Sequence, residues 1–134
     1  MKKDIHPPKV ENVAVAIVKE RNEINVEVWN VYLLNLGQEL IEGVLVTSKG
    51  YGEVRGESVK TSVLRHFLDT IEPGDFAKIE PIMENLFGIS NEYWVSFYKH
   101  RVMYDKKYVF VAESISENHL TNIPIINKPG VMIL

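Results

Sequence analysis

Residues 28–36 read VWNVYLLNL and residues 40–47 read LIEGVLVT, and the turn-forming sequence Ser48-Lys49-Gly50 follows the second run directly. Both runs are rich in β-branched and aromatic residues, which are enriched in strands. Runs of the same kind recur at residues 13–18 (VAVAIV), 63–71 (VLRHFLDTI), 93–98 (YWVSFY) and 104–111 (YDKKYVFV). Short strands separated by turn signals are typical of packed antiparallel sheets. The sequence predicts a mostly β protein, an antiparallel two-layer β-sandwich of immunoglobulin-like type with one or two short helices.

The length of 134 residues fits one domain. Pro7 and Pro8 oppose helix near the start, so residues 1–9 are expected to form an extended N-terminal tail and residues 10–134 a single sandwich domain. Residues 12–19 are apolar at both alternating sets of positions. That pattern favours a central strand covered on both faces.

The second half of the chain is expected to alternate between strands and tight turns. Residues 59–71 alternate as a strand, although their mixed second face also fits one side of an amphipathic helix. Residues 72–75 (EPGD) have Pro and Gly at the central positions of a type II turn. A short strand at residues 76–80 then ends at Pro81.

Three further elements are expected downstream. Residues 82–87 have helical spacing and precede Gly88, a plausible helix C-cap. Residues 91–99 and 102–112 are expected to form a hairpin that turns at His100-Arg101. Ser114 and Glu117 have the spacing of a capping box and predict a short helix.

Composition excludes several classes of protein. The net charge of −3 and the pI near 5.8 argue against a broad phosphate-binding surface, so nucleic acid is not the expected partner. The chain has no cysteine, which removes disulfides, thiolate metal ligands and cysteine nucleophiles. Residues 1–8 lack the apolar stretch of a signal peptide, and no apolar run approaches the roughly 20 residues of a membrane helix. We expect a soluble, cytoplasmic protein that does not act at a membrane.

No motif in the sequence indicates catalysis. Residues 49–58 contain three glycines but match neither a Walker loop nor a dinucleotide fingerprint, and a flexible hairpin loop is expected there. Arg65, His66 and Asp69 lie close together, but in a strand His66 points away from the other two. The four histidines (His6, His66, His100 and His119) lack the spacing of a local metal motif. No catalytic, cofactor-binding or metal-binding residue is predicted, and no cofactor is expected.

One stretch of the chain combines aromatic and basic side chains. Lys99, Arg101, Lys106 and Lys107 accompany tyrosines around the turn of the expected hairpin. Such a cluster can bind single-stranded nucleic acid by stacking and by phosphate contacts. Alternation places Lys106 and Lys107 on opposite faces, which favours an ordinary polar hairpin instead. These four residues are the candidate contacts for a nucleic acid or another anion, and Lys49 and Arg55 of the glycine-containing stretch are an alternative anion site.

The large aromatic residues are expected inside the sandwich. Trp29, Tyr32, Tyr93, Trp94 and Phe97 are interpreted as the core between the two sheets, and an aromatic face that binds a partner is the alternative.

The chain ends on the apolar sequence VMIL at residues 131–134, which is costly to leave in water. We expect these residues to pair along a sheet edge, either of the same chain or of a second copy in a homodimer.

Residues 28–35 (VWNVYLLN), 46–51 (VTSKGY) and 123–130 (IPIINKPG) resemble a family of small, uncharacterised bacterial proteins of the Bacteroidetes type, nearly from end to end. Members of that family sometimes carry the label phenylalanyl-tRNA synthetase alpha subunit. A class II synthetase core has a much larger sheet and arginine-bearing motifs that bind ATP. Arg55, Arg65 and Arg101 do not lie in such motifs, so the residues do not support that label.

Three functions remain open from the sequence. The first is a non-catalytic protein-interaction or scaffold module, with an unknown protein or a second copy as the partner. The second is a nucleic-acid or translation-associated factor that uses the four basic residues. The third is a small enzyme, which would need a pocket of convergent polar groups.

Overall fold

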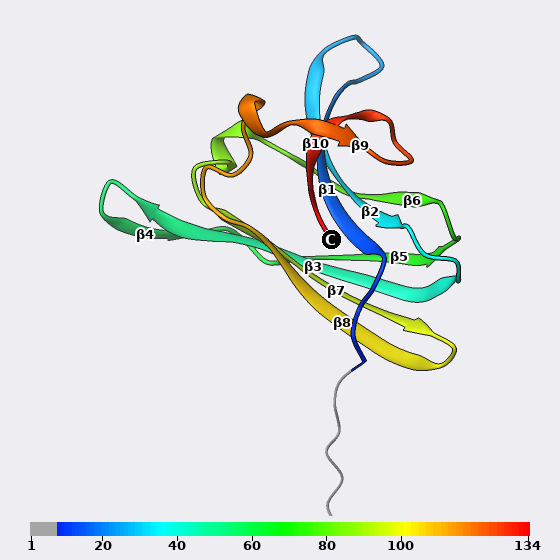
Figure 1. Ribbon diagram of the computed structural model, residues 1–134. Coiled ribbons are helices and arrows are strands. Elements are labelled where there is room, and N and C mark those ends of the chain that lie inside the picture. Colours follow the sequence, from blue (N-terminus) through cyan, green and yellow to red (C-terminus); the bar gives the residue numbers. More distant parts are fainter. Residues whose placement is uncertain (1–7) are drawn as a thin grey trace, which may run out of the picture.

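The computed structural model describes residues 8–134, and it confirms the antiparallel two-layer β-sandwich (Figure 1). The predicted tail at residues 1–9 lies mostly outside the described residues. The strands of the described part are β1 (Val13–Arg21), β2 (Glu27–Asn35), β3 (Ile41–Val54), β4 (Glu57–Lys60), β5 (Leu64–Ile71), β6 (Phe76–Ile82), β7 (Ser90–Lys99), β8 (Val102–Phe110), β9 (Thr121–Ile123) and β10 (Lys128–Ile133).

Sheet A has the strand order β6-β2-β1-β10-β9, and in sheet B the order is β3-β7-β8 with β4 and β5 both paired to the other edge of β3. Every strand pair is antiparallel. The chain passes from one sheet to the other after β2, β5, β6 and β8. The predicted central strand is β1, which lies between β2 and β10, and the C-terminal residues pair within their own sheet.

The core fills the space between the two sheets because one residue in two along each strand points inward. Val15 and Ile17 of β1 face this core together with Val46 of β3 and Val95 of β7. The aromatic part of the core comes from Trp29, Tyr93, Phe97, Tyr108 and Phe110, all of which are buried. The burial of these apolar side chains is the main term that stabilises the sandwich.

The hairpin expected at residues 49–58 is present, but paired strands form it and the prediction of a flexible loop was wrong. β3 continues through this stretch to Val54 and pairs with β4, so that only Arg55 and Gly56 form the turn, with φ of 53° and 81°. The other glycines serve close packing instead of flexibility. A Cβ atom on Gly50 would lie 3.0 Å from the Cδ1 atom of Ile89. This long hairpin projects beyond the sandwich at the left of Figure 1.

The single strand expected at residues 59–71 is two strands, β4 and β5, separated at residues 61–63. A bulge then interrupts β5 where Asp69 pairs with Val44, next to Gly43. Asp69 and Gly43 have φ of 62° and 56°, the left-handed region in which an extra residue is accommodated. The bulge shifts the alternation, and therefore Ile71 is buried although Phe67, four residues earlier, is exposed.

The two short helices are single 3₁₀ turns, η1 (Glu84–Leu86) and η2 (Glu117–His119). The capping box expected from Ser114 is absent, because its hydroxyl donates a hydrogen bond to the carbonyl oxygen of Val111. The predicted β7–β8 hairpin is confirmed. His100 and Arg101 both have positive φ, which a two-residue hairpin turn of type I′ requires.

Candidate functional site

Two of the aromatic residues expected in the core lie outside it. Tyr93 and Phe97 point inward from β7, so Trp94, which is adjacent to Tyr93, must point outward and is 48% exposed. Tyr32 lies on the outer face of sheet A beside Phe76. The prediction was therefore right for Trp29, Tyr93 and Phe97 and wrong for Trp94 and Tyr32.

Large apolar side chains gather on the outer face of sheet B, which we call the Trp94 face. Phe67 of β5 is 67% exposed and pairs with Leu45 of β3, which is 37% exposed. Trp94 is in register with Thr47, two residues along β3 from Leu45 and on the same face. The large apolar and aromatic residues of the Trp94 face that are exposed include Leu45, Tyr51, Phe67, Trp94, Tyr98 and Met103. An exposed patch of this kind is a mark of interaction surfaces.

The charges on the Trp94 face are largely compensated within it. The Glu92 side chain is only 7% exposed and lies 3.7 Å from the Lys49 ammonium and 3.9 Å from that of Lys107. Tyr51 donates a hydrogen bond to the same carboxylate at 3.2 Å, and burial, followed by this contact, raises the pKa of the Tyr51 phenol. The Lys107 ammonium also lies 5.0 Å from the centre of the Trp94 ring. Arg65 and Asp105 lie on the same face and add one charge of each sign, so the face has no large excess of either charge.

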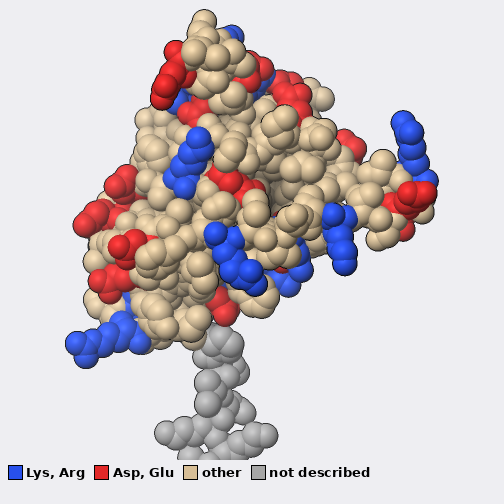
Figure 2. Space-filling view, turned by 180° about the vertical axis from the view of Figure 1, so that it is seen from behind, with Lys and Arg blue, Asp and Glu red and all other residues tan. Residues whose placement is uncertain are grey.

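The four basic residues singled out from the sequence do not share one face. Lys107 lies on the Trp94 face, and Arg101 lies at the hairpin turn. Lys106 points to the other side of β8, where it donates a hydrogen bond to the carbonyl oxygen of Leu134 at 3.0 Å. Lys99 lies 4.9 Å from the centre of the Tyr104 ring on that same side. Figure 2 shows basic and acidic side chains interspersed with uncharged surface on the side of the molecule that it presents.

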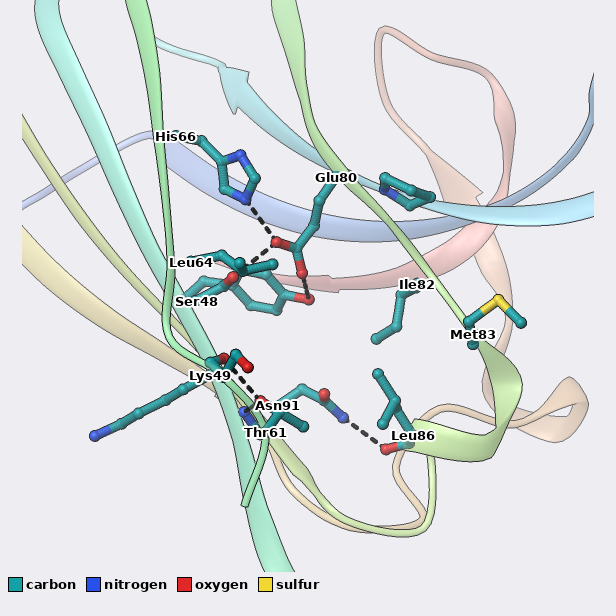
Figure 3. Close-up of a pocket in the computed structure, with 14 residues that line it drawn as sticks. Ser48, Lys49, Thr61, Leu64, His66, Glu80, Ile82, Met83, Leu86 and Asn91 are labelled. Carbon is teal, nitrogen blue, oxygen red and sulfur yellow. Dashed lines mark hydrogen bonds and ion pairs between the residues drawn. The ribbon is translucent and has the colours of Figure 1, made fainter.

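A cavity of about 530 Å³ opens between the start of β5 and the end of β6, where the two sheets face one another. Glu80 of β6 lies at one end of it, with its side chain 15% exposed (Figure 3). One carboxylate oxygen, Oε1, accepts hydrogen bonds from Ser48 Oγ and from His66 Nε2, both at 2.7 Å. The other oxygen, Oε2, accepts one from the Tyr93 hydroxyl at 3.3 Å. Burial and then the charge of Glu80 raise the pKa of the Tyr93 phenol, so it retains the proton that it donates.

The order of these groups differs from that of a serine nucleophile site. Such a site needs the imidazole between the serine and the carboxylate, so that the imidazole accepts the serine proton. Here the carboxylate of Glu80 lies between Ser48 and His66 and accepts a hydrogen bond from each. The arrangement holds the carboxylate in place and gives the Ser48 hydroxyl no contact with a neutral base.

The chain matches no family model, and no curated protein and no solved structure matches it. The resemblance to the bacterial family therefore remains a prediction.

Across residues 8–134, no group of three or more histidine, aspartate and glutamate side chains is placed to hold a metal ion. No helix in the same range is long and apolar enough to span a membrane.

Sequence reasoning did not find the Glu80 cluster. In the sequence His66 is a neighbour of Arg65 and Asp69, and Glu80 is one acidic residue among many. In the structure His66 turns inward and meets a residue of the opposite sheet. Only the register of Ser48 with Tyr93, and the position of β6 across from β5, bring these groups together.

Proposed function

We propose that this chain is a non-catalytic protein-interaction module whose partner docks an apolar surface on the Trp94 face. The observation that carries the proposal is the exposure of Phe67 and Trp94 on one sheet face beside Leu45. Full burial of a side chain of this size contributes about 1.5–3 kcal/mol. Binding that covers these residues thus has a substantial driving force.

The charge pattern supports an apolar protein surface as the partner. A nucleic acid needs a continuous row of free cations. Lys49 and Lys107 on this face are both engaged with Glu92, and Arg65 is a further cation on it. The remaining candidates (Lys99, Arg101 and Lys106) lie elsewhere, so the cations do not form a continuous row. Aromatic residues and arginine are enriched in protein–protein interfaces.

The proposal is tested by capture from native extract with three tagged forms of the chain: unchanged, Phe67→Ser, and Ile24→Ser as a matched control. Ile24 is 77% exposed at the β1–β2 turn, far along the chain from the Trp94 face, so its change removes similar apolar surface elsewhere. We expect one protein in stoichiometric amount with the unchanged and Ile24→Ser forms, and its loss with Phe67→Ser. Equal capture by all three forms contradicts the assigned surface. Capture of nothing, with a monomeric mass by light scattering, contradicts the function.

A further inference from the structure

We propose that the cavity between β5 and β6 is a binding site for an alkylammonium group, with the Glu80 carboxylate contacting the charge and the apolar walls contacting the chain. The site is separate from the Trp94 face, because Glu80 lies between the two sheets and the Trp94 face is on the outside of sheet B. Its volume of about 530 Å³ is in the range of small-ligand pockets.

The charge of the cavity favours a cation. Among the described residues Glu80 is the only carboxylate that lines it. His66 is the one ion-pair partner of that carboxylate in this part of the chain, and it compensates the charge only when its imidazole is protonated. Lys49 also lines the cavity, but Figure 3 shows its side chain pointing away from Glu80, and its ammonium lies 3.7 Å from the Glu92 carboxylate. A carboxylate largely removed from water is stabilised by an opposite charge.

The hydrogen bonds of Glu80 leave room for one more donor. A carboxylate offers about four lone-pair positions. Oε1 already accepts two hydrogen bonds of 2.7 Å, whereas Oε2 accepts only the longer one from Tyr93. The free capacity is therefore on Oε2. Figure 3 places this oxygen at the edge of the open space that Ile82 and Leu86 bound on the opposite side.

This geometry selects an ammonium over a guanidinium. A guanidinium binds a carboxylate most strongly through two parallel hydrogen bonds, one to each oxygen. Ser48 and His66 already occupy Oε1, so that paired contact is blocked. A primary ammonium is compact and needs one free oxygen.

The walls of the cavity suit a short methylene chain. Ile82 and Leu86 line it together with Met83 and Leu64, both of which are also exposed to solvent. A buried methylene group contributes about 0.8 kcal/mol. The ligand is thus an ammonium with an apolar chain of several carbons, which a free amine and a lysine side chain both provide.

The proposal is tested by titrating the isotope-labelled chain with n-hexylammonium and with n-hexanol while recording amide chemical shifts. The two probes have the same chain length and differ in charge. We expect n-hexylammonium to bind at least about tenfold more tightly, with shifts at β5, β6 and η1, and n-hexylguanidinium to bind more weakly than the amine. Equal affinity for the alcohol, or shifts centred elsewhere, overturns the proposal.

Two variants distinguish an effect of the Glu80 carboxylate from an effect of the net charge of the protein. Glu80→Gln keeps the shape of the side chain and should remove the preference for the amine over the alcohol. Glu72→Gln removes the same charge from the exposed turn before β6 and should leave the preference unchanged. A preference that survives Glu80→Gln overturns the proposal. The probe comparison uses the unchanged chain, so it decides the question even when Glu80→Gln unfolds.

The last arm distinguishes the two sources of the ammonium. N-acetyl-lysine methylamide carries the lysine side chain on an uncharged backbone. Binding as tight as that of n-hexylammonium assigns the site to a lysine of a protein, and binding more than about tenfold weaker assigns it to a free amine. Absence of binding by both compounds overturns the proposal.

Discussion

The outer faces of the two sheets differ in what covers them. On sheet A, Ala14, Ala16 and Val18 of β1 are fully buried, because Ile123 and the turn that follows it lie over them. On sheet B, Phe67 and Trp94 are exposed. Both faces carry apolar residues, but only one is covered by its own chain.

The two outer faces also differ in the size of their side chains, and this size decides whether a segment of the same chain can pack on them. The alanines on β1 keep the outer layer thin, so the segment from Ile123 to Ile126 packs close to the sheet. Gly130 on β10 allows the closest approach, since a Cβ atom there would lie 2.5 Å from the Ile17 carbonyl oxygen. The Trp94 face has large side chains instead, which suit an external partner.

The largest expected effect is on the covered face. Ile123→Ala removes a fully buried side chain from the small outer core of sheet A. We expect the free energy of unfolding to fall by about 2–5 kcal/mol, measured by urea denaturation. A loss below about 1 kcal/mol would mean that the C-terminal segment does not cover this face.

Gly130→Ala tests the close approach of β10 to β1. The added methyl group would meet backbone that cannot move aside, so the expected loss is about 1–3 kcal/mol in the same measurement. Gly37→Ala is the control, because the nearest atom to its Cβ would be 3.4 Å away, an ordinary contact. Similar losses for both variants would contradict the argument.

Glu20 adds a pH dependence to the covered face. Burial alone raises the pKa of Glu20, but hydrogen bonds from Lys128, Tyr32 and Asn30 together outweigh it and hold the pKa below its ordinary value of 4.5. Because the folded pKa is lowered, this stabilisation is present above about pH 4.5 and is lost as pH falls through the folded pKa.

The corresponding measurement is the melting temperature between pH 3 and pH 6. We expect Glu20→Gln to cost about 1 kcal/mol at pH 6 and to make the acid side of the profile shallower. Glu23→Gln, at the exposed β1–β2 turn, should leave the profile unchanged. A profile for Glu20→Gln that matches the unchanged chain would rule out this role.

The smallest expected effect is on the Trp94 face. Phe67→Ser should change the free energy of unfolding by no more than about 0.5 kcal/mol, because the side chain is already mostly in water. Together with Ile123→Ala it sharpens the comparison between a covered and an uncovered apolar residue. A loss of 2 kcal/mol or more would show that Phe67 stabilises the chain itself.

The sandwich was predictable from local patterns. Alternation along β7 and β8, with the His100-Arg101 turn between them, specifies a hairpin without further information. The central position of β1 was also readable, because residues apolar on both faces need cover on both sides.

The candidate sites were less predictable, because they depend on which segments return over which face. Adjacent Tyr93 and Trp94 cannot both point inward, but alternation alone does not say which one does. The bulge at Asp69 reverses the alternation within β5, and the cluster of Ser48, His66 and Glu80 joins residues from both sheets. The residues adjacent to these side chains in the sequence do not indicate the contacts.

The most direct test of the account is photo-cross-linking in the native cell from a benzoylphenylalanine placed at position 67, at position 24 or at position 126. We expect one discrete intermolecular product from position 67, on the Trp94 face, and none from the β1–β2 turn or from the covered face. A product with the mass of two chains identifies the partner as a second copy. No product from position 67, or the same product from all three positions, would contradict the claim that the Trp94 face is the surface left for a partner.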